Sequence, residues 1–526
     1  MQWFALGATV VLLDASLTFE NLWPTPAITW HGRLSVELAV GVLALLLVSR
    51  ASGPLSRRAV AWVSAVWTLF VLGRYAEVTA PALYGRDVNL YWDLRFIPDV
   101  VSMVTRVAPV WIVALCVGAA ALVLTALYGL LRWSLRRVST AMADPRARRA
   151  LAVPSVAATI WYVALQVNAD VPGELAFAAP VTRTYARQLR FVAEAMTGST
   201  SLAESPAMDA DLSGITGADV FVVFVESYGA VAFQRPEIAG PLAASRRELD
   251  TAIRETHRDV VSAYVESPTF GGNSWLAHLS LMSGIEVRDP ETNAKLMTAQ
   301  RDTLARAFSR RGFRTIALMP GLRQKWPEGS FYGFDEIYGA DRLDYWGPEF
   351  GWFAIPDQYS LQRLDALEVN RSSRPPLFVF FPTISTHFPF SPTPPYQPNW
   401  PRMTDRHPYE GPDIVRAYAR QPDWTDFAPG YVDAMAYDFA SIGGFLRLRP
   451  ERDSVMILLG DHQPPAVVTG EGAPWDVPVH VIASRKPVLD RLVAHGFRQG
   501  LTPERPAIAR MHALVPVLLD AFSDGR

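Results

Sequence analysis

The apolar segment at 108–131 limits what this chain can form more than any other feature. Within it the run VWIVALCVGAAALVLTALYGLL holds no charged residue. The segment is longer than the roughly 20 residues that a helix needs to cross a bilayer. It therefore predicts a membrane-spanning helix.

Four further apolar segments lie in the same part of the chain, at 3–19, 34–49, 59–79 and 151–167. We predict that the five segments form a transmembrane bundle over residues 1–170. Asp14 interrupts the first segment and Glu37 the second, and both segments are short. An interfacial or buried helix is the alternative for these two.

Arginines predict the orientation of the bundle. They follow the second apolar segment and, in larger number, the fourth, whereas the loops at 20–32 and 80–107 are poorer in basic residues. The arginines are Arg57, Arg58, Arg132, Arg136, Arg137, Arg146, Arg148 and Arg149. The positive-inside rule places these arginines in the cytoplasm and the chain after about residue 168 outside. No small-residue cleavage site follows the first segment, so we expect a tethered outer domain.

Composition excludes several other classes of protein. The net charge of −2 over 526 residues gives no sign of a nucleic-acid partner. Cys116 is the only cysteine. An internal disulfide and a cysteine metal cluster are therefore excluded.

From about residue 215 the pattern changes to short apolar runs rich in β-branched residues, separated by helical stretches such as 243–257, 298–311 and 430–446. The runs are 219–225, 259–265, 314–319, 376–381, 454–459 and 477–483. This alternation predicts an α/β domain over 215–526, with a largely parallel sheet covered on both faces. Residues 171–214 are predicted as a linker.

Ligands of such sheets bind beyond the carboxyl ends of the strands, and polar side chains follow five of the predicted strands. They are Glu226 after the first, Ser274 after the second, Arg323, Lys325 and Trp326 after the third, His387 after the fourth, and Asp461 with His462 after the fifth. Their convergence predicts a catalytic centre.

Asp461 and His462 offer oxygen and nitrogen ligands side by side, which suit zinc or manganese. Glu226 would be the third ligand. Ser274 follows two glycines and opens a helix, where backbone N–H groups stabilise an anion, and a neighbouring cation would make its hydroxyl a nucleophile. The alternatives are a turn acid beside a solvated histidine, a helix-capping glutamate and a helix-capping serine. Thr269 is the fallback nucleophile.

The other candidates have simpler alternatives. His387 is predicted to donate to a phosphate or to act as a general acid, the alternative being a packed loop histidine. Trp326, with Arg323 and Lys325, can bind a head group, although a chain with 16 tryptophans uses many of them in packing. His278 lies one helical turn after Ser274 and is a candidate for substrate contact. His480 lies within a strand and is expected to pack there.

Four motifs carry a resemblance to a known family: VESYG at 225–229, GGNSW at 271–275, STHFPF at 385–390 and GDHQPP at 460–465. With them the chain resembles the alkaline phosphatase and sulfatase superfamily. Within it, the chain is similar to membrane phosphotransferases such as lipoteichoic acid synthases and phosphoethanolamine transferases.

The resemblance implies one divalent metal, Mn²⁺ or Zn²⁺, held by Glu226, Asp461 and His462, with Ser274 as its fourth partner. It implies a covalent phospho-serine at Ser274, a phosphate contact at His387 and a head-group pocket lined by Trp326. His278 stands where a sulfatase has an arginine, which disfavours sulfate esters.

We therefore expect a metal-dependent phosphotransferase in a bacterial plasma (inner) membrane, multi-pass, with its catalytic domain periplasmic or extracellular. A membrane lipid carrying phosphoglycerol or phosphoethanolamine would be the donor, and an envelope glycan or lipid the acceptor. The alternatives are a phosphodiesterase or sulfatase-like hydrolase of soluble esters, and a non-catalytic membrane scaffold or sensor.

Overall fold

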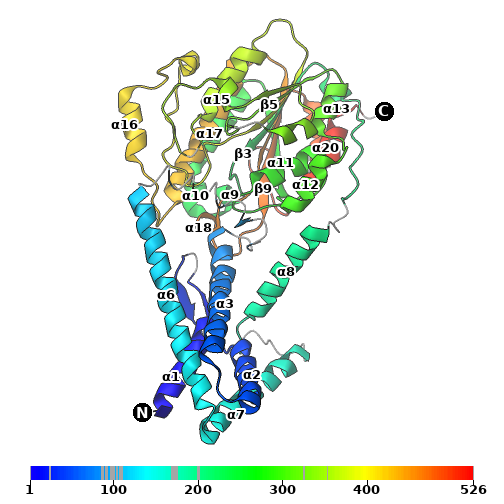
Figure 1. Ribbon diagram of the computed structural model, residues 1–526. Helices are drawn as coiled ribbons and strands as arrows, with labels where there is room; N and C mark the ends of the chain where they lie inside the picture. The colour runs from blue at the N-terminus through cyan, green and yellow to red at the C-terminus, as the bar shows by residue number, and fades with distance from the viewer. Residues whose placement is uncertain are drawn as a thin grey trace. The chain divides into compact units, whose positions relative to one another are not determined.

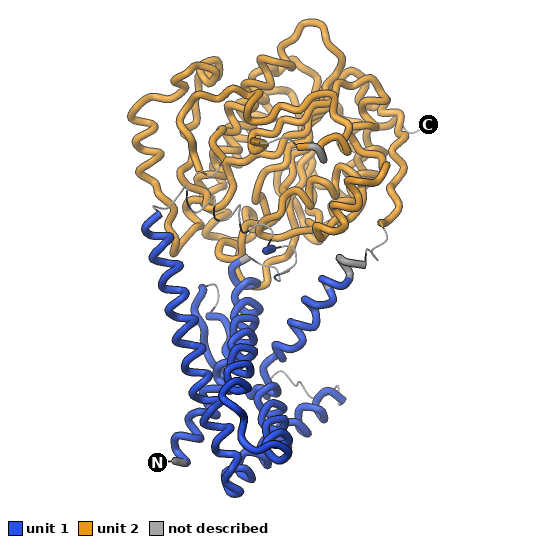
Figure 2. Tube along the Cα trace, viewed as in Figure 1, with its two compact units in different colours: residues 1–199 blue, residues 200–526 orange. Residues whose placement is uncertain are grey.

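A computed structural model describes the chain except for Met1, 23–24, most of 85–109, 168–175, 198–201, 324–325, Trp352 and 525–526. The chain divides into two compact units, residues 1–199 and 200–526 (Figure 2). Each unit is described by itself.

All five predicted apolar segments are helical in unit 1. They form α1 (Gln2–Thr18), α2 (Val36–Ser52), α3 (Arg57–Tyr84), α6 (Val110–Ala141) and α7 (Pro145–Val167). Three of the described helices are long and apolar enough to cross a membrane, at Arg57–Leu83, Val110–Ala141 and Pro145–Val167. The other two have 17 residues each. Three candidate spans are thus present, and five spans stay a prediction.

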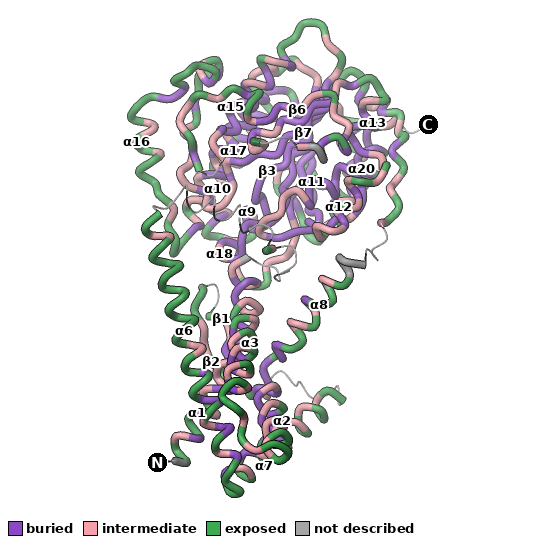
Figure 3. Tube along the Cα trace, viewed as in Figure 1, coloured by how far each residue is buried: buried purple, intermediate pink, exposed green. Residues whose placement is uncertain are grey.

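The surface of α6 shows which solvent it suits. None of its most apolar window is buried within the chain, and most of α6 is coloured as exposed in Figure 3. Large apolar side chains of this helix, such as Trp111, Leu115 and Leu122, are exposed. A contiguous apolar surface of this kind is unfavourable in water and favourable in lipid.

Unit 1 also contains elements that the sequence pattern did not predict. A short antiparallel hairpin joins β1 (Phe19–Asn21) to β2 (Ile28–Trp30). Helix α8 (Val181–Thr197) lies inside 171–214. The predicted linker at 171–214 therefore contains a helix, and the division between the two units falls within it, after residue 199.

Unit 2 is built around one sheet with the strand order β10-β4-β9-β8-β3-β7-β5-β6, and β11 also pairs with β4. Its strands are β3 (Asp219–Val225), β4 (Asp259–Glu266), β5 (Arg314–Leu318), β6 (Glu336–Tyr338), β7 (Leu377–Pro382), β8 (Ser454–Gly460), β9 (Asp476–Ala483), β10 (Arg498–Gln499) and β11 (Ala509–Arg510). All six predicted strands are present, and the three short strands at the sheet's margins were not predicted.

The sheet is mixed and thus differs in part from the predicted, largely parallel one. β8, β3, β7, β5 and β6 pair in parallel. β9 is antiparallel to both of its neighbours, β4 and β8. Because β4 and β8 are both antiparallel to β9, they run in the same direction as each other. The carboxyl ends of β3, β4, β5, β7 and β8 therefore still meet at one edge of the sheet.

Alternate residues of the strands enter two separate cores. From β3, Val220, Val222 and Phe224 pack on one side of the sheet, and Phe221 and Val223 pack on the other. Strands buried on both faces lose the apolar–polar alternation of a half-exposed strand, which is why their sequences are almost continuously apolar.

Helices cover both faces of the sheet (Figure 1). One face packs against α10 (Pro236–Glu255), α15 (Asp357–Leu364) and α17 (Ala428–Leu448). The other packs against α11 (Ser274–Ser283), α13 (Leu304–Arg310), α19 (Lys486–Ala494) and α20 (Leu514–Phe522). The remaining helices include α9 (Val231–Gln234), α12 (Pro290–Thr298), α14 (Ala340–Leu343), α16 (Gly411–Ala419) and α18 (Ala466–Thr469).

Candidate active site

The register between β3 and β8 places two acids side by side. The two strands are parallel, and Val225 pairs with Gly460 as their last pair. Glu226 and Asp461 each follow immediately, so they leave the sheet at the same level. A Cβ at Gly460 would lie 1.8 Å from the Tyr228 carbonyl oxygen, so only glycine allows the backbone to pass there.

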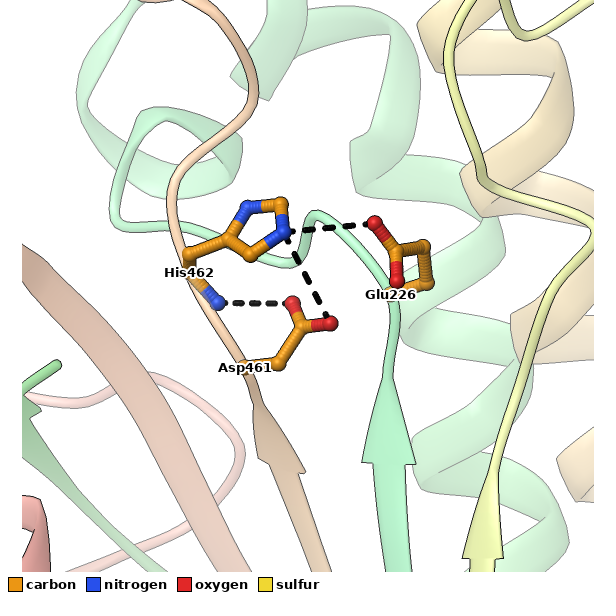
Figure 4. Close-up of side chains that lie close together, drawn as sticks. All are labelled: Glu226, Asp461 and His462. Carbon is orange, nitrogen blue, oxygen red and sulfur yellow. Dashed lines mark hydrogen bonds and ion pairs between the residues drawn. The ribbon is translucent and has the colours of Figure 1, made fainter. Parts of the chain in front are cut away.

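The three predicted metal ligands converge (Figure 4). His462 Nε2 lies 3.3 Å from Glu226 Oε1 and 3.8 Å from Asp461 Oδ2. One donor atom from each residue lies within 4.8 Å of the others. All three side chains are buried.

Hydrogen bonds orient each of these donors. His462 Nδ1 lies 2.7 Å from the Gln463 carbonyl oxygen; a carbonyl only accepts, so Nδ1 carries the proton and Nε2 faces the carboxylates. Asp461 Oδ1 accepts from the backbone N–H groups of Ser227 at 2.8 Å and His462 at 2.6 Å. Asp461 Oδ2 is buried without a hydrogen-bond partner.

The charges of the cluster compete with one another. Burial opposes the charged form of His462, but the carboxyl groups of Asp461 and Glu226 outweigh it and raise the pKa of His462 to about 9. Burial alone would raise the pKa of Glu226, but the charge of His462 holds it below its usual range. Burial and the charge of Glu226 both raise the pKa of Asp461 well above its usual range.

This donor set fits a divalent cation. Two carboxylates and an imidazole nitrogen are oxygen and nitrogen ligands of the kind that zinc and manganese take. The buried Asp461 Oδ2 accepts no hydrogen bond from the described residues, and a buried oxygen of this kind is costly to leave unpaired. A bound cation would satisfy it.

Ser274 lies against this cluster. Its Oγ donates to Glu226 Oε2 at 2.7 Å and lies 3.2 Å from His462 Nε2. Ser274 is the first residue of α11, and Asn273 occupies the N-cap position with φ 61°. The serine hydroxyl therefore does not cap the helix, which excludes the structural alternative for Ser274. Its side chain is only half-buried.

The loop before Ser274 is attached to the segment that carries the metal ligands. Ser267 Oγ donates to the Asp461 carbonyl oxygen at 2.5 Å, and the Gly271 N–H donates to the Gln463 carbonyl oxygen at 3.0 Å. These bonds bring Ser274 across from β4, although β9 separates β4 from β8. Thr269 Oγ1 donates to the Gly272 carbonyl oxygen and thus stabilises the turn, which favours Ser274 over the fallback.

His387 lies near the cluster, and its charge contributes to the low pKa of Glu226. Its Nδ1 lies 2.7 Å from the Phe388 carbonyl oxygen, so Nδ1 donates and Nε2 is left for other partners. The imidazole is half-buried and packs edge-on against Phe353, with ring centroids 5.1 Å apart.

The other predicted residues differ in position. His278 is buried between Phe224 and Phe380, and burial lowers its pKa to about 3. The imidazole thus lies in the core, and contact between His278 and a substrate stays a prediction. His480 is buried and bonded to Tyr228 and Ser262, which confirms that it packs.

Of the predicted head-group residues, Trp326 is half-buried and packs against Tyr332, with ring centroids 5.2 Å apart. Arg323 is exposed. Lys325 lies outside the described residues. Trp326 therefore has a packing role. Only the exposed part of its side chain is able to line the predicted head-group pocket.

Sequence reasoning missed Thr383. Its Oγ1 accepts from the Glu226 backbone N–H at 3.1 Å, and its own N–H donates to the Phe224 carbonyl oxygen. Thr383 follows β7, the neighbour of β3. A polar residue directly after an apolar strand was the available signal.

Part of unit 2 matches a known protein family, and several solved structures are similar to the chain. Residues 280–478 match the family model Sulfatase, and a search of curated proteins finds no match. The lipooligosaccharide phosphoethanolamine transferase EptA of Neisseria meningitidis is similar over 98% of this chain and 96% of its own, with 13% identity and a TM-score of 0.48.

Two further solved structures are similar over a smaller part of the chain. The lipoteichoic acid synthase LtaP of Listeria monocytogenes covers 56% of this chain and 70% of its own, with 15% identity and a TM-score of 0.36. The phosphoglycerol transferase GacH of Streptococcus pyogenes covers 64% and 80%, with 12% identity and a TM-score of 0.36. The family match lies within unit 2 and agrees with the predicted resemblance to the alkaline phosphatase and sulfatase superfamily.

Proposed function

We propose that this enzyme transfers the head group of a membrane phospholipid, phosphoglycerol or phosphoethanolamine, to an acceptor in the cell envelope through a phospho-serine at Ser274. One observation carries the proposal. The Ser274 hydroxyl lies at the start of a helix, 2.7 Å from Glu226 and 3.2 Å from His462, within a cluster that fits a divalent cation.

In the first half-reaction Ser274 Oγ attacks the phosphorus of the donor phosphodiester. Its proton passes along the existing hydrogen bond to Glu226 Oε2. The bond from phosphorus to the diacylglycerol oxygen breaks, and that oxygen takes a proton from His387 Nε2. The first N–H groups of α11 face the negative phosphoryl oxygens.

In the second half-reaction an acceptor hydroxyl attacks the phospho-serine and gives its proton to His387 Nε2. Ser274 Oγ leaves phosphorus and recovers its proton from Glu226. A divalent cation, Zn²⁺ or Mn²⁺, held by Glu226, Asp461 and His462 would supply Lewis-acid stabilisation of negative charge on the serine oxygen.

The membrane helices support a lipid donor. Three described helices are able to span a bilayer. The positive-inside rule favours a cytoplasmic position for the arginine-rich segments that follow α2 and that end α6. Unit 2 would then work at the outer face of a bacterial plasma membrane, where a lipid head group is the nearest phosphodiester. Trp326 and Arg323 are proposed to contact that head group by stacking and charge.

Peptide mass spectrometry tests the proposal. The purified chain is incubated briefly with Mn²⁺ and mixed bacterial phospholipids and then digested. A phosphoglycerol or phosphoethanolamine adduct on the peptide that contains Ser274 is the expected result. An unmodified peptide with intact lipids, combined with turnover of nitrophenyl phosphodiesters, would contradict a lipid donor and favour a hydrolase of soluble esters. No turnover and no cation binding would favour a scaffold.

Replacing His387 with glutamine is expected to lower kcat by about 10²–10³-fold, because general acid catalysis commonly contributes this much. Far-UV circular dichroism and cation binding should stay unchanged, since His387 is not among the proposed ligands. The matched control is His495→Gln, which changes an exposed histidine paired with Asp520. A kcat within twofold of the wild type for His387→Gln would contradict the acid assignment.

A further inference from the structure

Two buried aspartates lie against the loop that follows β7. Asp357 is the first residue of α15 and Asp438 lies within α17. Each is 1% exposed. Both carboxyl groups bond to the same short stretch of chain, Asp357 to Ile384 and Ser385 and Asp438 to Thr386. The charge of Asp357 contributes to the raised pKa of Asp438.

Both aspartates hold the segment 383–387, which we name the β7 exit loop. Asp357 accepts from the backbone N–H of Ile384 at 2.9 Å and of Ser385 at 2.7 Å. Ser385 Oγ in turn accepts from the Asp357 N–H at 3.2 Å. Thr386 Oγ1 donates to Asp438 Oδ2 over a longer distance of 3.5 Å.

The β7 exit loop connects two parts of the active site. At its start Thr383 accepts from the Glu226 N–H at 3.1 Å. At its end lies His387, whose N–H donates to the Ile384 carbonyl oxygen at 3.2 Å. The position of the loop thus fixes both the backbone of a proposed cation ligand and the proposed general acid.

The two carboxyl groups cannot both be ionised at low cost, because like charges in contact within a buried site repel each other strongly. Asp357 has two backbone N–H donors, which favour its ionised form. The hydroxyls of Thr383 and Thr386 favour the ionised form of Asp438 more weakly, and in the described part of the chain no backbone N–H donates to its carboxyl group. The shared proton therefore belongs on Asp438.

We propose that Asp357 and Asp438 form a buried acid pair that shares one proton, held by Asp438, and that this pair positions Glu226 and His387 through the β7 exit loop. The inference rests on the proposed function for the role of His387. Both aspartates are positioning residues, because they touch neither the cation ligands nor the expected place of the substrate.

The environment of the pair agrees with this protonation. Burial raises the pKa of Asp357 to about 6 and that of Asp438 well above its usual range. The titratable groups that face the pair are Tyr409 and Tyr437, and burial raises the pKa of both phenols. Tyr437 Oη accepts from the Gln358 N–H at 3.2 Å. Both phenols stay neutral and supply no counter-charge to the pair.

Two asparagine variants of equal volume and equal burial provide the test. Asp438→Asn keeps a neutral group able to donate to Asp357, and its kcat should stay within about threefold of the wild type. Asp357→Asn places an amide donor opposite the N–H groups of Ile384 and Ser385, so the β7 exit loop should shift. A displacement of about 1 Å near reacting groups can cost 10²-fold; we expect kcat to fall by about 30–100-fold at unchanged KM for the lipid.

Thermal unfolding at different pH values provides a readout that needs no turnover. Because folding raises the pKa of Asp438, the stability it contributes is present at pH below about 4 and is lost as pH rises towards the folded pKa. Asp438→Asn has no such loss. The difference in Tm between Asp438→Asn and the wild type should therefore grow in favour of the variant between pH 5 and pH 8.

The outcomes separate the inference from the proposed function. Equal losses of kcat in both variants, with a Tm difference that does not depend on pH, would overturn the acid pair. Wild-type kcat in a folded Asp357→Asn would overturn its positioning role. If the wild type turns over no phospholipid, the proposed function has failed, and the Tm series still decides the protonation of the pair. The series also decides it if Asp357→Asn does not fold, because it uses only Asp438→Asn.

Discussion

Replacing Ser274 with alanine is expected to reduce turnover of a phospholipid donor by about 10⁴-fold or more, the scale of loss seen when a nucleophile is removed. The variant should fold normally, because the Ser274 hydroxyl makes no capping hydrogen bond in α11 and is only half-buried. Phosphate release or lipid conversion under single-turnover conditions measures the loss, and circular dichroism checks the fold.

Two controls complete the experiment on Ser274. Ser484→Ala removes an exposed hydroxyl bonded to Asp453 and should leave turnover unchanged. Thr269→Val removes the only other hydroxyl considered as a nucleophile, and turnover should stay within about tenfold because Thr269 Oγ1 serves the turn at Gly272. If Thr269→Val is inactive and Ser274→Ala is active, the nucleophile assignment is wrong.

Removal of divalent cations is expected to abolish turnover and to lower Tm. A ligand present at 100 times its Kd stabilises the folded state by about 2.7 kcal/mol, which corresponds to a rise in Tm of about 5 °C for a chain of this kind. Chelation followed by titration with Zn²⁺ or Mn²⁺, monitored by differential scanning fluorimetry and by turnover, measures both effects.

The variant Asp461→Asn should separate the cation from the fold. Asn at this position keeps an oxygen for the N–H groups of Ser227 and His462, and its amide nitrogen can donate to Glu226. We expect the cation-free variant to melt at or above the wild-type Tm, because the repulsion between Asp461 and Glu226 is relieved. The rise in Tm on adding the cation should disappear.

An exposed acid supplies the matched control for this variant. Asp490 pairs with Lys486 on the surface of α19, and Asp490→Asn should keep the full response to the cation. A cation-dependent rise in Tm that persists in Asp461→Asn would show that the cation binds elsewhere.

The sequence predicted the site better than it predicted the sheet. Glu226, Asp461 and His462 directly follow apolar runs, Ser274 opens the helix after another, and the structure brings all four together. The reason is physical: strands that run in the same direction end at the same edge, so the loops that follow them become neighbours. That rule needs no knowledge of the strand order.

Strand direction could not be predicted in the same way. β9 runs antiparallel to its neighbours although its sequence, DVPVHVIA, is as apolar as that of β4 or β8. Burial on both faces produces this pattern for either direction, so periodicity carries no sign of the reversal. His278 was likewise placed on the correct turn of a helix, but the pattern did not reveal that its side chain enters the core.

The acid pair shows a different limit. Asp357 and Asp438 lie in two helices that are distant in sequence, and each has the appearance of an ordinary surface acid. Only the packing of α15 against α17 buries them. The contact with the β7 exit loop, and hence with Thr383 and Glu226, follows from tertiary structure alone.

The register of β3 and β8 has a consequence for how such a site can change over time. Glu226 and Asp461 each stand one position beyond the pair Val225 and Gly460. The relative position of the two acids depends on this pairing and not on the length of the chain between them. Insertions in the intervening loops and helices can therefore accumulate without moving the two acids, whereas one residue added or lost between strand and acid would separate them. Chains of very different length can share this centre, provided that the count of residues from the last paired position is kept.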